Sequence, residues 1–342
     1  MPLLHSILHA TNFKNPLLRT LVPSIGLAYS IQTVVAIPSI LFQTERFYDL
    51  SGSLTYVSCT ALSLYLPTLR AITAARASGI APPQWPNLLT SLTTKDTSGS
   101  WNWRQVVLST AVTIWAARLG SFLFARITSE GKDSRFDKIR SSVPAFATAF
   151  FAQATWVSLC LLPVLVVNSI PTTAFTSIPP VTITDILGLF LYVGGLTFEV
   201  VADRQKSQWM QEKKEKRHSE EFMTRGLWSR SRHPNYFGES TLWTGIATTS
   251  AGVMINCAGQ MGMSGLTGKL GALMVAGVSP AFTTFILLKV SFKVWKWDCN
   301  GKLIAYQVSG VPMSEKKYDR RFKGNKEYEK WKKETPIFIP KL

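Results

Sequence analysis

The polar residues best suited to chemistry gather in one short segment, SRSRHPNYFGE at 229–239, which leads directly into an apolar stretch. Arginine guanidinium groups present paired N–H donors that match phosphate oxygens. Asn235 offers an amide that can hydrogen-bond a base, a ribose or a carboxamide, and Glu239 adds a carboxylate. Pro234 suits the first position of a helix, whose free N–H groups favour anions. The segment therefore predicts a site for a large anionic cofactor with a polar head. The basic residues available to surround its phosphates are Arg204, Lys206, Arg230, Arg232 and His233.

Ionisable residues inside or at the ends of apolar stretches form a second group of candidates, because charge is expensive within a membrane. This group contains Arg118 within WAARLGSFLF, Glu199 and Asp203 within FEVVADRQK, and Glu239 at the start of the next apolar stretch. A structural interpretation stays open for each of them. Basic residues beside a membrane span commonly set topology or contact lipids, and a carboxylate near a helix N-terminus can simply complement the helix dipole.

Seven apolar runs, each near the ~20 residues that a bilayer crossing needs, must position these side chains. Hydrophobic residues make up 46% of the 342-residue chain. A soluble protein can bury one such helix, but seven predict an all-α polytopic membrane protein with about seven transmembrane helices. The runs are 17–42, 52–69, 105–125, 143–167, 182–202, 236–258 and 269–289.

The formal net charge is +17. In a soluble chain this would indicate nucleic-acid binding, but in a membrane protein it indicates basic loops on the cytoplasmic side, so no nucleic-acid partner is expected. The two most basic stretches outside the apolar runs are 203–235 and the tail from 291. Placing both inside predicts a cytosolic C-terminus. The four cysteines are scattered without C-x-x-C spacing, which predicts neither a metal site nor a disulfide framework.

Four separated motifs stand out along the second part of the chain. They are WAARLGSFLFARI at 115–127 followed by GKDSRFD, FEVVADRQK at 198–206, GLWSRSRHPNYFGE at 226–239 and YEKWKKETPIFIP at 328–340. In this order they resemble the steroid 5-alpha-reductase-like membrane family, and within it the DUF1295 branch. The resemblance covers 105–342 and implies a steroid-reductase-like domain that holds NADPH in the C-terminal half. Residues 1–104 are then a variable N-terminal membrane region with two spans and a loop.

The resemblance also implies which residues hold the cofactor. The matching positions are Asp203, Arg204, Asn235, Tyr236, Glu239, Tyr328 and Lys332. Asp203 and Arg204 match the family's acidic–basic pair, and Asn235 and Glu239 match its Asn and Glu beside the cofactor. Tyr236 matches an aromatic neighbour, and Tyr328 and Lys332 match the Tyr and the basic residue of the tail. The steroid reductases carry a Tyr three residues before the Arg of the third span, whereas this chain has Trp115 before Arg118. Since an indole is a poor proton donor, Tyr236 and Glu239 are the catalytic candidates, and Arg118 is a candidate on the substrate side.

The expected function is therefore that of an NADPH-dependent oxidoreductase that reduces a carbon–carbon double bond of a lipid-like substrate, such as a sterol, an enoyl lipid or an isoprenoid. Membrane lipids are expected partners, and the endoplasmic reticulum is the expected location. Two alternatives stay open. The first is a related membrane methyltransferase, because isoprenylcysteine methyltransferases carry a similar Arg-His-Pro-x-Tyr-x-Gly segment and use S-adenosylmethionine. The second is a non-enzymatic membrane protein. The ADRQK pair and the EYEKWKK tail favour the reductase.

Residues 290–307 interrupt the resemblance. Val-Ser occurs at both edges, at 290–291 and at 308–309, and removal of 290–307 leaves LLKVSGVPMSEKKYDRRF, an uninterrupted family motif. Val-Ser can be encoded GTGAGT, the start of an intron, and Gln307 can be encoded CAG, the end of one. We interpret these residues as a translated intron, with a real insertion as the alternative, and we place no site residue among them.

Overall fold

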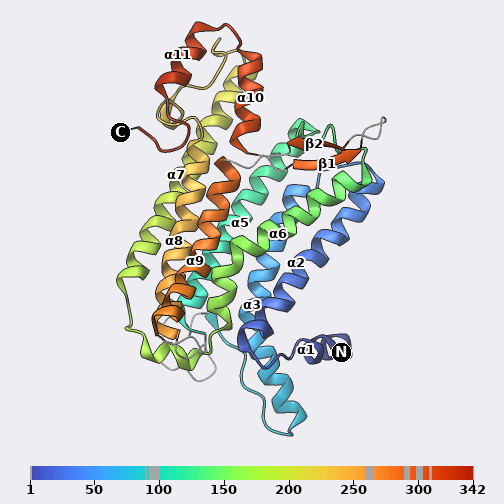
Figure 1. Cartoon of the computed structure of the whole chain (residues 1–342), viewed down its shortest axis with the longest axis vertical. Coiled ribbons are helices and arrows are strands. Elements are labelled where there is room, and N and C mark those ends of the chain that lie inside the picture. The colour runs from blue at the N-terminus through green and yellow to red at the C-terminus, as the bar shows by residue number, and fades with distance from the viewer. Residues whose placement is uncertain are drawn as a thin grey trace. The chain divides into compact units, whose positions relative to one another are not determined.

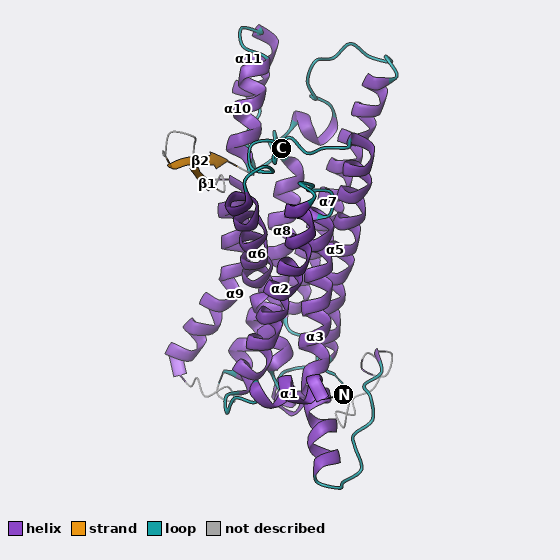
Figure 2. Ribbon diagram, turned by 90° about the vertical axis from the view of Figure 1, so that its right-hand side faces the viewer, coloured by secondary structure: helices purple, strands orange, loops and turns teal. Residues whose placement is uncertain are grey.

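The computed structural model describes residues 2–88, 91, 101–258, 265–288, 293–297, 303–307 and 310–341. Helices make up nearly all of the regular structure in these ranges (Figure 1 and Figure 2). The α-helices are α1 (Pro2–Ala10), α2 (Pro16–Leu41), α3 (Tyr48–Ala77), α5 (Trp103–Glu130), α6 (Val143–Ser169), α7 (Ile183–Lys214), α8 (Pro234–Cys257), α9 (Gly265–Leu288), α10 (Val311–Arg321) and α11 (Lys326–Glu334). The other described elements are two 3-10 helices, η1 (Thr172–Ser177) and η2 (Gly226–Ser229), and two strands, β1 (Lys293–Trp297) and β2 (Leu303–Gln307).

The long helices coincide with the seven apolar runs predicted from the sequence. Five of them, α2, α5, α6, α7 and α9, are long and apolar enough to cross a bilayer, which indicates an integral membrane protein. Helices α3 and α8 carry more Ser, Thr and Gly and do not reach that apolarity, so the count of seven spans stays a prediction. Helix α7 continues well past the predicted end at 202, because its charged continuation is rich in Gln and Lys, which favour helix.

The chain divides into two compact units, Met1–Leu187 with Ile246–Ser279 and Gly188–Gly245 with Pro280–Leu342. In the first unit α2 packs against α3 and α6, and α3 also packs against α5. Polar side chains join these helices. Gln32 Nε2 on α2 donates to Thr55 Oγ1 on α3 at 2.8 Å, and Gln153 Nε2 on α6 donates to the Tyr48 carbonyl at 2.9 Å. Such bonds between helices help to hold a bundle together in lipid, where no hydrophobic force drives helix association.

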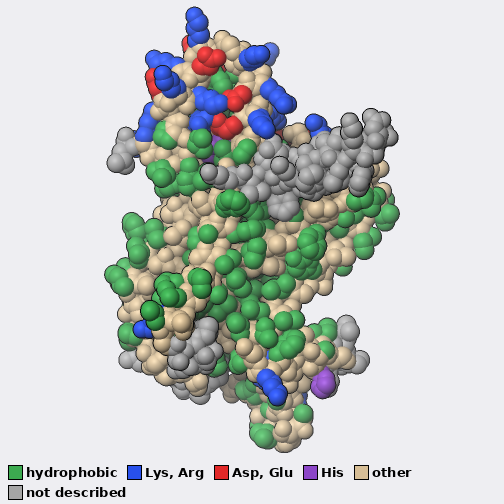
Figure 3. All heavy atoms as spheres, viewed as in Figure 1, with side chains coloured by type: hydrophobic (Ala, Val, Ile, Leu, Met, Phe, Trp, Pro, Cys, Tyr) green, Lys and Arg blue, Asp and Glu red, His purple; other side chains and the backbone are tan. Residues whose placement is uncertain are grey.

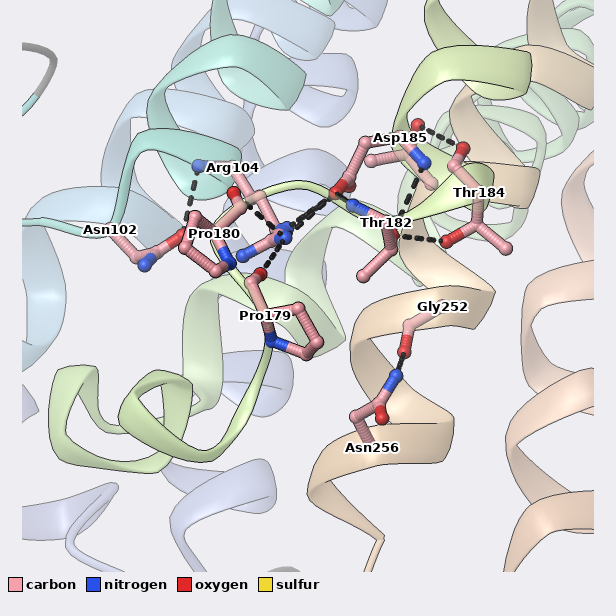
Figure 4. A network of polar contacts seen from close by, with 10 residues as sticks. Asn102, Arg104, Pro179, Pro180, Thr182, Thr184, Asp185, Gly252 and Asn256 are labelled. Atoms are coloured by element: carbon pink, nitrogen blue, oxygen red, sulfur yellow. Dashed lines mark hydrogen bonds and ion pairs between the residues drawn. The ribbon is translucent and has the colours of Figure 1, made fainter.

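The start of α5 is fixed to the start of α7 by a buried ion pair in the first unit (Figure 4). The side chains of Arg104 and Asp185 are 2% and 5% exposed, and the guanidinium donates to both carboxylate oxygens at 2.7–3.1 Å. Arg104 Nη2 also donates to the Pro179 carbonyl at 2.8 Å, and the Thr182 N–H donates to Asp185 at 2.8 Å. The charges are therefore paired, and hydrogen bonds at Pro179 and Thr182 hold the loop that enters α7.

A second ion-pair cluster fastens the GKDSRFD motif to the turn between α2 and α3. Arg140 donates twice to the buried Glu45 carboxylate, each bond 2.6 Å long, and the Asp133 N–H donates to the same carboxylate at 2.7 Å. Burial acts to raise the pKa of Glu45, but these hydrogen bonds outweigh it and the pKa lies below its usual value. The motif therefore has a structural role in the first unit.

In the second unit α7 and α8 are in direct backbone contact, side by side (Figure 1). A Cβ atom added to Gly195 would lie 2.5 Å from the Leu242 nitrogen, and one added to Gly238 would lie 2.6 Å from the Glu199 nitrogen. Only glycine permits so close an approach, which is common between membrane helices. The contact holds the first turns of α8 beside the 195–199 segment of α7.

Strands β1 and β2 form an antiparallel hairpin in which Lys293 lies opposite Gln307 and Trp297 opposite Leu303. Within the described ranges these are the two strands in an otherwise helical fold, and both fall inside 290–307, the segment interpreted as a translated intron. The other residues of 290–307 lie outside the described residues, and the intron hypothesis stays a prediction.

Candidate functional site

The C-terminal tail folds back onto the SRSRHPN segment within the second unit. The Arg232 N–H donates to the Pro336 carbonyl and the Lys341 N–H donates to the Arg230 carbonyl, each at 2.9 Å. The Ser231 hydroxyl donates to the Phe338 carbonyl at 2.8 Å. Two motifs that are far apart in the sequence are therefore joined through the main chain.

Aromatic packing holds α11 in place beside the segment that follows α7. Phe222 contacts Phe322, Tyr328 and Trp331, with ring centroids 5.4–5.5 Å apart. Aromatic pairs in such tilted and edge-on arrangements contribute ~0.5–1.5 kcal/mol each beyond their buried area. The cluster sets where the polar face of α11 lies.

Charged side chains gather over α10 and α11 (Figure 3). Glu315 of α10 accepts from Arg232 Nη1 through Oε2 and contacts His233 Nε2 through Oε1 at 2.8 Å. Lys332 Nζ of α11 lies 2.5 Å from Asp319 Oδ1 and 3.9 Å from Glu315 Oε2. Tyr328 completes the group, because its hydroxyl donates to Asp319 at 2.9 Å. Arg232 from the SRSRHPN segment, which we call the rim, and Lys332 from the tail thus meet around the carboxylates of Glu315 and Asp319.

His233 is a buried, neutral member of this group. Burial lowers its pKa despite the favourable contact with Glu315, and the positive charges of Lys206 and Arg232 lower it further. A carboxylate only accepts hydrogen bonds, so Nε2 carries the imidazole proton. The His233 ring also stacks on Tyr236, with centroids 5.6 Å apart and planes within 5°. His233 therefore contributes a donor and a stacking face to the site, but no positive charge near pH 7.

Arg232 has an unsatisfied donor. Its side chain is 8% exposed, and Nε is buried with no hydrogen-bond partner among the residues that the structure describes. Buried polar groups are nearly always paired, so each exception in a native fold requires an explanation. An anionic oxygen from a bound ligand would satisfy this donor, and in this respect the site fits a phosphate-bearing cofactor.

The other candidates in this unit lie at the end of α7 and the start of α8. Lys206 Nζ lies 4.6 Å from the ring centre of Trp228, whose indole N–H donates to the Ala202 carbonyl at 3.0 Å. Helix α8 begins at Pro234 as predicted, and its first turns carry the half-buried Asn235, Tyr236 and Glu239. Asp203 is half-buried on α7, whereas the side chains of Arg204 and Arg230 are exposed. The contacts therefore join part of the predicted set, namely Arg232, His233, Tyr236, Tyr328 and Lys332. Lys206 lies close enough to lower the pKa of His233 through its charge.

Arg118 belongs to the first unit, where it is half-buried on α5. A groove in the same unit, between α2 and α6, is lined mainly by apolar residues such as Ile37 and Phe150 and contains none of the predicted site residues. In the described part of the chain no group of three or more His, Cys, Asp or Glu side chains is placed to hold a metal ion.

A family model described as "Protein of unknown function (DUF1295)" matches residues 83–294. The chain belongs to the DUF1295 family. No curated protein and no solved structure matches it. The DUF1295 match includes the end of α7, the SRSRHPN segment and α8, and it ends at residue 294, inside the hairpin segment. Helices α10 and α11 lie beyond the matched range.

Glu315 and Asp319 were not among the residues predicted from the sequence. The spacing of these residues could have indicated them, because the two acids are four residues apart on α10, as Tyr328 and Lys332 are on α11. Residues four apart share a helix face. An acidic pair and a Tyr–Lys pair on consecutive short helices could have been expected to face each other.

Proposed function

We propose that this DUF1295 protein is an NADPH-dependent membrane oxidoreductase that reduces a carbon–carbon double bond of a lipid-like substrate. The observation that carries the proposal is the buried Arg232 guanidinium, which has an unsatisfied Nε donor and pairs with Glu315. Lys332 Nζ lies 3.9 Å from the same carboxylate. The four-motif resemblance to steroid 5-alpha-reductase-like enzymes supports the choice of cofactor and reaction.

The rim residues supply the groups that a dinucleotide needs. In the proposal Arg232 and Lys332 bind phosphate oxygens, and the exposed Arg204 and Arg230 add positive charge around them. The amide of Asn235 binds a polar group of the cofactor through paired donor and acceptor atoms. The ring of Tyr236, already stacked on His233, offers a flat surface to a planar group.

Reduction of a double bond requires a hydride at one carbon and a proton at its neighbour. NADPH supplies the hydride when it is bound. The Tyr236 phenol and the Glu239 carboxyl are the proposed sources of the proton, and both lie within the first two turns of α8. If the double bond is conjugated to a carbonyl, a donor from the same residues stabilises the developing enolate oxygen. Arg118 is the proposed contact on the substrate side.

The membrane setting supports a lipid-like substrate. Five helices in the described part of the chain are long and apolar enough to span a bilayer, so a hydrophobic substrate can reach the protein from the lipid phase. We place the protein in the endoplasmic reticulum membrane. Its C-terminus is proposed to be cytosolic, because the basic stretch 203–235 and the basic tail from 291 favour the cytoplasmic side.

Cofactor binding by the detergent-purified full chain tests the proposal. Intrinsic tryptophan fluorescence is measured during titration with NADPH and, separately, with S-adenosylmethionine. Saturable quenching by NADPH that weakens at least tenfold in Arg232→Ala and in Asn235→Ala supports the reductase. A response to S-adenosylmethionine alone replaces it with a methyltransferase. A folded protein that responds to neither contradicts both enzymes.

A further inference from the structure

The hydrogen bonds of Glu315 resemble those of a bound anion. One carboxylate oxygen accepts from Arg232 Nη1, and the other lies 2.8 Å from His233 Nε2. Lys332 Nζ lies 3.9 Å from the first of these oxygens. Two oxygens of a phosphate group would use the same donors in the same way, because guanidinium and imidazole N–H groups are common phosphate ligands.

The donors around Glu315 exceed what the carboxylate uses. Arg232 is more than nine-tenths buried, and its Nε has no hydrogen-bond partner among the described residues. A carboxylate offers two oxygens, whereas a phosphate group offers three around a tetrahedral centre. A phosphate placed where the Glu315 carboxylate lies would accept from Nη1, and its third oxygen could reach Nε.

The Glu315 carboxylate and a phosphate group cannot both lie against Arg232, because both are negatively charged. Glu315 and Asp319 formally neutralise Arg232 and Lys332, and His233 is neutral. A dianion that reaches Arg232 would lie within contact distance of a carboxylate of the same sign, where repulsion in a partly buried site is strong. Binding of a phosphate therefore requires the Glu315 side chain to turn away.

We infer that Arg232, His233 and Lys332 form a subsite for one phosphate group, and that Glu315 occupies this subsite until the phosphate displaces it. Glu315 is then the residue that determines how tightly the site takes a dianion. The inference rests on the proposed function, since it assigns one phosphate of the cofactor to particular residues of the same site.

Binding of inorganic pyrophosphate to the detergent-purified full chain tests the subsite without reference to catalysis. The dissociation constant is measured at constant ionic strength by the shift in melting temperature and by tryptophan fluorescence. We expect Glu315→Gln to bind pyrophosphate about tenfold more tightly than the wild type, because the competing charge is gone. Glu329→Gln, which removes an exposed carboxylate from α11, is the matched control and should leave the affinity unchanged. Arg232→Gln should lose pyrophosphate binding.

Glu315→Asp keeps the test decisive if Glu315→Gln fails to fold. The shorter side chain retains the charge but cannot reach both Arg232 and His233, so pyrophosphate should again bind more tightly than in the wild type. Equal or weaker binding in the folded Glu315 variants overturns the inference. NADPH titration of the same samples separates the two proposals. Tighter pyrophosphate binding without any NADPH binding leaves the subsite standing and removes the cofactor assignment. NADPH binding that weakens in Arg232→Gln and Asn235→Ala but is unchanged in Glu315→Gln leaves the cofactor standing and removes the role of Glu315 as the occupant of the subsite.

Discussion

His233 Nε2 lies 2.8 Å from Glu315 Oε1, although the two residues are 82 positions apart in the sequence. The contact joins the start of α8 to α10 and accompanies the backbone bond from Arg232 to Pro336. It fixes the tautomer of a buried imidazole and aligns a guanidinium beside it. The charged rim of the second unit is therefore held together by its C-terminal tail.

The first prediction concerns the acid sensitivity of His233. Burial lowers its folded pKa, whereas the unfolded value is about 6.5. Between these two values the unfolded chain binds more protons, so this contribution to stability is complete above about pH 6.5 and declines as the pH falls toward the folded pKa. The melting temperature of the wild type should fall more steeply than that of His233→Gln between about pH 7 and about pH 5. His9→Gln, at an exposed position, should retain the wild-type slope, and equal slopes in all three proteins would contradict the assignment.

The second prediction tests the contact between α7 and α8. A Cβ atom at Gly195 would lie 2.5 Å from the Leu242 nitrogen and 2.7 Å from the Gly238 oxygen, whereas one at Gly194 would meet nothing within 4 Å. Gly195→Ala should destabilise the protein by ~1–3 kcal/mol, because the backbones must separate. Gly194→Ala on the same helix should be neutral or stabilising by up to ~1 kcal/mol. The melting temperatures of both variants, measured in the same detergent, test this prediction. An equal decrease in melting temperature in both variants would exclude a specific contact between α7 and α8 at Gly195.

The third prediction concerns the buried pair of Arg104 and Asp185. Asp185→Asn leaves the guanidinium buried without its counter-charge and should cost ~3–5 kcal/mol. Asp137→Asn removes a carboxylate that is 57% exposed and pairs with Arg140 at 3.4 Å, and it should change stability by less than ~1 kcal/mol. Replacement of both Arg104 and Asp185 by apolar residues should recover part of the loss. If thermal unfolding of Asp185→Asn matches that of Asp137→Asn, the pair has no role in stability.

The fourth prediction concerns residues 290–307. Lys293 lies opposite Gln307, so the pairing brings the first described residue of the segment beside its last residue. A variant that lacks 290–307 should therefore remain monodisperse in detergent, with a melting temperature no lower than that of the full chain. Its NADPH affinity should also be unchanged. Aggregation of the shortened chain would support a real insertion, as would mature transcripts that mostly read through the segment.

Much of the fold was accessible from the sequence because lipid imposes a strong and local constraint. Every backbone polar group in a bilayer must be paired within the segment, so an apolar run of sufficient length has to be a helix. The positions of the long helices and the helix start at Pro234 followed from patterns within single segments. Membership of the DUF1295 family followed from four separated motifs in the same order along the chain. Helices α3 and α8 show the limit, because Ser, Thr and Gly place them below the apolarity of a clear span.

The sequence by itself determined which residue types gather near the rim, and the tertiary structure decided how they are paired. Arg232 and His233 were recognisable as basic groups beside an apolar run, and Lys332 as the basic residue of the tail that the family resemblance implies. Their partners Glu315 and Asp319 lie on a separate helix, and only packing of the tail onto the rim brings the opposite charges within bonding distance. Burial, which also depends on the whole fold, makes His233 neutral and leaves Arg232 Nε without a described partner. Electrostatic energy depends on distance and solvent exposure in three dimensions, and neither quantity is present in the order of residues along a chain.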